Sequence, residues 1–129
     1  MLKRILAAVV GGLSVINGLT MLFDSEHWFI STPGVASTGP FNSHFVADVG
    51  VAFIAAGLAL VVRSWRVRFW SAAVAGSAFL VFHALIHVTE FVIHPHDLLT
   101  MLGVSISAVL ALWTALPTQG EKNAQRLCP

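Results

Sequence analysis

Four long apolar runs limit what this chain can fold into. They cover residues 5–23, 45–62, 69–93 and 98–116, and each is close to the roughly 20 residues that an α-helix needs to cross the hydrocarbon core of a bilayer. The composition agrees, since 57% of the 129 residues are hydrophobic and 10% are charged, whereas soluble domains carry about 25% charged residues. The sequence predicts an all-α, integral membrane four-helix bundle, formed by a single domain over residues 1–118.

The basic residues predict the orientation of this bundle. All seven fall at the N-terminus, in the connection between the second and third runs, or in the C-terminal tail: Lys3, Arg4, Arg63, Arg66, Arg68, Lys122 and Arg126. By the positive-inside rule both termini are expected in the cytoplasm. The connection over 24–43 is then an outer loop, and 119–129 is expected to be a disordered cytoplasmic tail. The net charge of +1 gives no reason to expect nucleic-acid binding. The partner expected from the apolar runs is the lipid bilayer.

Small residues recur every four positions on three of the runs. The sets are Ala52 and Ala56, Ala72 and Gly76, and Gly103, Ser107 and Ala111. Small side chains let helix backbones approach closely in lipid, where van der Waals contact holds helices together. These faces predict tight packing within the bundle, and contact with other membrane subunits or a second copy of the chain.

The third run carries a polar stripe. His83, His87 and Glu90 are spaced four and three residues apart, so they lie on one face of a helix. Three more residues with metal-binding side chains follow: His94, His96 and Asp97. Ionisable residues at membrane depth are costly and usually face an interior or a water-filled cavity. The stripe therefore predicts a functional or hydrogen-bonded site.

A second polar pair is expected at the same depth. Counted at about 1.5 Å per residue from the inner ends of the runs, His83 and Asp48 both lie roughly 21 Å up, and His87 and His44 roughly 27 Å up. Imidazole and carboxylate groups suit copper, iron or zinc, and metal sites in helix bundles are built from facing helices. We therefore expect a metal site near the outer face with His44, Asp48, His83 and His87 as ligands. Glu90 is expected to be a fifth ligand, a partner of a ligand or a proton carrier.

Several other functions fit the same residues. The histidines and carboxylates can form a purely structural hydrogen-bonded cluster in an accessory subunit of a larger complex. His44 opposite His87 can ligate a haem, and an intramembrane carboxylate can couple a small transporter to protons. A metal with an open position can also activate water or dioxygen, so enzymatic activity stays open. The single Cys128 excludes an internal disulfide.

The chain also resembles a known family. Four short spans, an outer loop ending in TGPFNSHFVADVG and a third span with HALIHVTEF are similar to the small DoxX-like membrane proteins of bacteria. This resemblance implies a bacterial inner-membrane protein, in a family of which some members associate with redox enzymes. The favoured hypothesis is a small metal-binding membrane protein that serves as an accessory component of a redox or oxygenase-type assembly.

Overall fold

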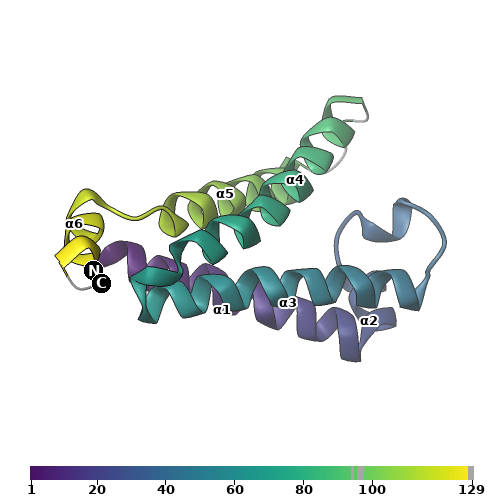
Figure 1. Ribbon diagram of the computed structural model, residues 1–129. Coiled ribbons are helices and arrows are strands. Elements are labelled where there is room, and N and C mark those ends of the chain that lie inside the picture. Colours follow the sequence, from purple (N-terminus) through teal and green to yellow (C-terminus); the bar gives the residue numbers. More distant parts are fainter. Residues whose placement is uncertain (94, 96–97, 128–129) are drawn as a thin grey trace.

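The computed structural model describes residues 1–93, 95 and 98–127, and these contain helices without strands (Figure 1). The elements in chain order are α1 (Leu2–Phe23), α2 (Ser25–Ser31), η1 (Val35–Ser37), α3 (Ser43–Trp65), η2 (Val67–Phe69), α4 (Trp70–Ile93), α5 (Leu98–Ala115) and α6 (Gln119–Leu127). The helices α1, α3, α4 and α5 supply four segments that are long and apolar enough to cross a membrane. The predictions of an all-α chain and of four membrane-length helices are confirmed.

The N-terminus and helix α6 lie together at one end of the molecule (Figure 1). We call this the terminal end. The connection from α1 to α3 and the last turn of α4 lie toward the opposite end, which we call the far end. The long connection after α1 contains α2 and η1, and the Trp28 indole donates a hydrogen bond to Asn17 Oδ1 over 3.0 Å. This bond ties α2 to the far part of α1.

The closest helix contact joins α1 and α3, which run antiparallel. Gly11 lies against Gly57, and one heptad further along Gly18 lies against Gly50. A Cβ atom at Gly11 would lie 2.7 Å from the Gly57 carbonyl oxygen, and a Cβ at Gly50 would lie 2.8 Å from the Gly18 carbonyl oxygen. Because real side chains do not tolerate such distances, the two backbones approach this closely only with glycine at these positions.

Helix α4 crosses α3 in the half of the molecule nearer the terminal end. A Cβ atom at Gly76 would lie 3.1 Å from the Ala56 Cα atom, so the small residues predicted on these two helices do meet. Gly103 instead faces open space, and its predicted role in packing is not observed. The buried core is rich in alanine: Val10, Ala56, Leu60, Ala73, Leu80, Ala84, Ala108, Ala111 and Ala115. Toward the far end α4 diverges from α3 (Figure 1).

The C-terminal segment differs from the expected disordered tail. It forms helix α6, which begins with a reciprocal capping box. The Thr118 hydroxyl accepts a hydrogen bond from the Glu121 amide over 3.3 Å, and Glu121 Oε2 accepts one from the Thr118 amide over 2.7 Å. The cap satisfies backbone donors that a helix start otherwise leaves free, so the polar composition of the segment is compatible with a short helix.

Candidate functional site

His83 and His87 form the central pair of the candidate site. Both lie on α4, one helical turn apart, and their Nε2 atoms are 3.3 Å from each other. Both side chains are half-buried. The close approach follows from the helix itself, because residues four apart stack on one face. This part of the sequence prediction is observed.

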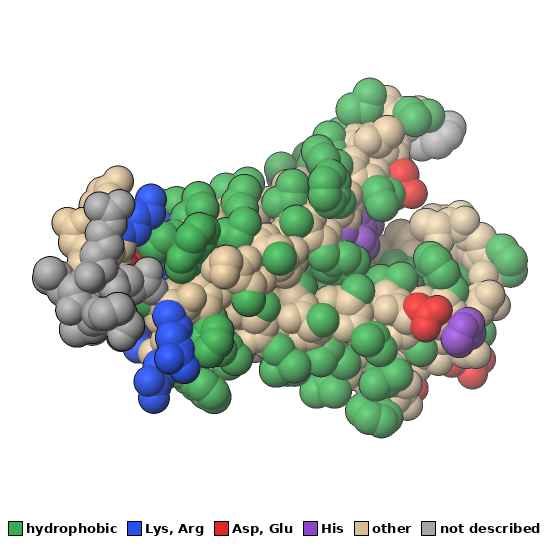
Figure 2. Space-filling view, viewed as in Figure 1, with side chains coloured by type: hydrophobic (Ala, Val, Ile, Leu, Met, Phe, Trp, Pro, Cys, Tyr) green, Lys and Arg blue, Asp and Glu red, His purple; other side chains and the backbone are tan. Residues whose placement is uncertain are grey.

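Aromatic rings surround His83. Phe53, from α3, meets the His83 ring edge-on at a centroid distance of 5.1 Å, and Phe79, one turn earlier on α4, stacks on it at 5.9 Å. Phe53 and Phe79 also touch each other edge-on at 5.1 Å. The two phenylalanines fix the His83 ring and give the pair an apolar floor. Figure 2 shows histidine surface where α4 diverges from α3, at the bottom of a hollow that opens toward the far end.

The geometry of the pair allows two kinds of chemistry. Two neutral imidazoles can share a hydrogen bond, one Nε2 donating and the other accepting. Alternatively, both Nε2 atoms can bind one metal ion. Two nitrogen ligands at about 2.0–2.1 Å from a tetrahedral metal stand roughly 3.3–3.4 Å apart, which matches the observed separation of 3.3 Å.

His44 and Asp48 form a separate pair at the start of α3. The His44 Nε2 atom is 3.5 Å from Asp48 Oδ2, and the two side chains are 88% and 65% exposed. Asn42 caps this helix by accepting a hydrogen bond from the Phe45 amide. The predicted i, i+4 pairing within α3 is therefore observed, as a contact on the protein surface.

Glu90 lies in a third place. It lies on an open, shallow and apolar part of the surface of α4, together with Phe82, Leu85, Ile86, Thr89 and Ile93. Within residues 1–93, 95 and 98–127, no group of three or more His, Cys, Asp or Glu side chains is placed to hold a metal ion. His94, His96 and Asp97 lie outside the described residues. The structure thus brings the five predicted ligands together as two pairs and one separate carboxylate.

Equal depth along two helices does not ensure contact. The depth count places His44 level with His87, yet it contains neither the tilt of α4 nor the direction in which each side chain points. In the structure α4 leaves α3 toward the far end (Figure 1), and His44 is almost fully exposed. The helical spacing predicts the pairs, but their relative placement depends on packing between helices.

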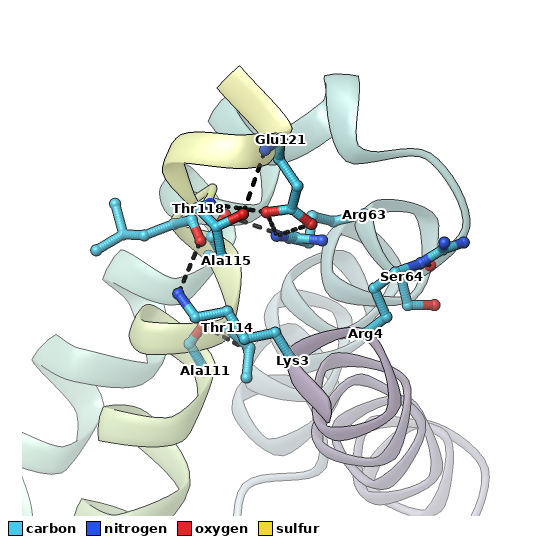
Figure 3. A network of polar contacts seen from close by, with 10 residues as sticks. Lys3, Arg4, Arg63, Ser64, Ala111, Thr114, Ala115, Thr118 and Glu121 are labelled. Atoms are coloured by element: carbon cyan, nitrogen blue, oxygen red, sulfur yellow. Dashed lines mark hydrogen bonds and ion pairs between the residues drawn. The ribbon is translucent and has the colours of Figure 1, made fainter. Parts of the chain in front are cut away.

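Sequence reasoning missed a second polar cluster, at the terminal end (Figure 3). Arg63, expected in a connection, lies inside α3 and is 0% exposed. Its Nη2 atom is 3.1 Å from Glu121 Oε2, and its Nε donates to the Ala115 carbonyl over 3.4 Å. The Thr118-x-x-Glu121 capping pattern was the signal in the sequence that could have indicated an ordered carboxylate near the end of α5.

Comparisons of the chain with protein-family models, with curated proteins and with solved structures found no match in any of the three. The resemblance to DoxX-like proteins therefore stays a prediction. What the candidate site offers is defined by its own chemistry: two imidazole nitrogens at ligand spacing, on a membrane-length helix, beside an aromatic floor.

Proposed function

We propose that this membrane protein binds a transition-metal ion through His83 and His87. The observation that carries the proposal is the 3.3 Å separation of the two Nε2 atoms, which equals the spacing of two ligands on one tetrahedral metal. Imidazole is a good ligand for copper, zinc and iron. Two histidines leave further coordination positions for water, a substrate or a donor from a partner protein.

The surroundings of the pair support this proposal. Placing a polar side chain on a membrane-length helix costs free energy unless a partner satisfies it. Such residues therefore often mark functional sites. Phe53 and Phe79 hold the His83 ring against the helix. A side chain that is already held in place loses less conformational entropy when it binds a metal. The hollow above the pair (Figure 2) gives an ion a route from the far end.

The proposed role is that of an accessory component of a redox or oxygenase-type membrane assembly. The chain has little mass outside its four long helices, which is typical of accessory subunits of larger membrane complexes. A structural role for the pair is the competing function, because the same 3.3 Å separation also fits a hydrogen bond between neutral imidazoles. The two functions differ in one respect, which is whether the pair holds a metal.

Metal analysis of protein purified in mild detergent without chelator tests the proposal. We expect near-stoichiometric copper, zinc or iron in the wild-type protein and its loss in His83→Ala and in His87→Ala. The matched control is His44→Ala, which removes a histidine from the exposed i, i+4 pair on α3 and should leave the metal content unchanged. An optical spectrum of the same sample tests the haem alternative.

Two results would contradict metal binding by this pair. The first is wild-type protein that stays free of metal after exposure to copper, zinc and iron salts. The second is metal that persists in both His83→Ala and His87→Ala. Either result, with the variants still folded in detergent, would favour the structural hydrogen bond.

A further inference from the structure

The turn between α3 and α4 exposes two arginines flanked by tryptophans. Its sequence is Trp65-Arg66-Val67-Arg68-Phe69-Trp70, and it lies at the terminal end. Trp65 is the last residue of α3 and is 70% exposed, and Trp70 begins α4. Arg66 has an extended backbone, with φ −131° and ψ 105°, and the short helix η2 follows it. Arg66 and Arg68 are exposed.

Three other basic residues at this end are engaged within the protein (Figure 3). Lys3 donates to the Leu116 carbonyl over 3.1 Å, just after α5. Arg4 donates to the carbonyls of Ser64 and Trp65 over 2.6 and 3.0 Å, at the end of α3. Arg63 is the third of these residues. All three donate to carbonyl groups that the last turn of a helix leaves without an intrahelical donor.

Arg66 and Arg68 differ from these three residues. The ion pairs within the described part of the chain are His44–Asp48 and Arg63–Glu121, so neither exposed arginine takes part in one. The Arg68 guanidinium lies 4.9 Å from the centre of the Phe69 ring, which orients the group and leaves its N–H donors available.

The distribution of charge makes the turn a positive surface. Glu121 is the acidic side chain of the terminal end and is held by Arg63. Figure 2 shows the lysine and arginine side chains gathered at the terminal end and acidic side chains toward the far end. The opposite charges of the two ends cancel in the net charge of +1, so the electric field at the turn is stronger than the net charge suggests.

We propose that residues 65–70 bind the headgroup of an anionic phospholipid. The phosphate would accept hydrogen bonds from Arg66 and Arg68, since guanidinium groups present donors in a fork that matches phosphate oxygens. Trp65 and Trp70 would pack at the boundary between headgroups and hydrocarbon, where indole rings are enriched. The position of the turn, at the ends of two membrane-length helices, places it at that boundary and favours a lipid over a soluble anion or an acidic protein.

Native mass spectrometry of the detergent-purified protein tests this proposal. The protein is titrated with phosphatidylglycerol and, in parallel, with phosphatidylcholine of the same chain length. We expect the wild type to prefer phosphatidylglycerol, and the preference to fall about fivefold for each arginine replaced in Arg66→Gln and Arg68→Gln. Lys122→Gln is the matched control, because it removes an exposed positive charge of the same end from α6 instead of the turn and should leave the preference largely intact.

Equal binding of the two lipids by the wild type would overturn the proposal. So would a loss in Lys122→Gln as large as that in the arginine variants, because the effect would then belong to the general charge of the terminal end. If the arginine variants do not fold, the wild type still gives an answer. A headgroup bound by exposed guanidiniums has to lose its preference when salt is raised from about 0.05 to about 0.5 M, and a preference that survives would refute the site.

Discussion

Arg63 carries a guanidinium group into the interior of a largely apolar molecule. Removing a charge from water costs several kcal/mol, and the cost is offset only when the partners are close and well oriented. Here Glu121 supplies the opposite charge through both carboxylate oxygens, at 3.1 and 3.3 Å, and the Ala115 carbonyl accepts from Nε. The Nη1 atom is buried and has no hydrogen-bond partner among the described residues. The position of Arg63 therefore depends on Glu121 and on the helix that carries it.

The first prediction concerns this ion pair. Glu121→Ala should lower the free energy of unfolding by about 2 kcal/mol, because the buried guanidinium loses its counter-charge and Thr118 loses its reciprocal cap. The expected loss is below the roughly 3–5 kcal/mol of a fully buried pair, since the Glu121 side chain is 21% exposed. Denaturation in detergent micelles, followed by circular dichroism, measures the change.

A neighbouring charge on α6 provides the control for this variant. Lys122→Ala removes an exposed side chain of the same helix and should change the stability by no more than about 0.5 kcal/mol. Equal stabilities of Glu121→Ala and wild type would show that the ion pair contributes nothing to the folded state.

The four-residue spacing in the sequence predicts the two pairs of polar side chains, but it does not predict whether the pairs form one site. His83 with His87, and His44 with Asp48, meet because four residues advance a helix by about one turn. Whether the pair on α3 meets the pair on α4 depends on helix tilt and rotation, which no short stretch of sequence contains. Arg63 was missed for a related reason, because the end of α3 at Trp65 lies beyond the last residue of the apolar run.

At the scale of whole elements, the glycines between α1 and α3 are the main determinant of packing. The four-residue spacing of small residues predicts the α3–α4 contact at Gly76 but not this contact. Gly11 and Gly18, like Gly50 and Gly57, are seven residues apart, which is two helical turns on one face. A seven-residue period would have predicted the pair of helices that pack most closely.

Two adjacent glycines on α1 allow a sharp test of this contact. Gly11→Ala should destabilise the protein by about 1–3 kcal/mol, since the new methyl group would collide with the Gly57 carbonyl oxygen and the Leu60 and Val61 side chains. Gly12 has open space around its Cβ position, so Gly12→Ala should be neutral or stabilising by up to about 1 kcal/mol. Unfolding curves of the two variants in the same detergent give the comparison, and equal effects would show that the helices do not approach as closely as described.

For the molecule as a whole, the separation of charge is the feature that relates the structure to the membrane. The elements of the terminal end carry six described basic side chains: Lys3, Arg4, Arg63, Arg66, Arg68 and Lys122. The end of α1, the helix α2, the start of α3 and the end of α4 carry Asp24, Glu26, Asp48 and Glu90 toward the far end. An excess of lysine and arginine in short segments next to the spans holds those segments in the cytoplasm. The orientation with both ends of the chain in the cytoplasm therefore stays a prediction from this distribution of charge.

The last prediction is this orientation in a bacterial plasma membrane. Cys128 is first replaced by serine, and single cysteines are then introduced at Ser37 in η1 and at Lys122 in α6, both of which are exposed. A membrane-impermeant maleimide should label the cysteine at position 37 in cells with a permeabilised outer membrane, because the connection after α1 faces outward. It should label the cysteine at position 122 only after lysis, because the basic terminal end is held inside. Labelling in the reverse order would place the histidine pair near the cytoplasmic face, and metal would then have to reach His83 and His87 from the cytoplasm.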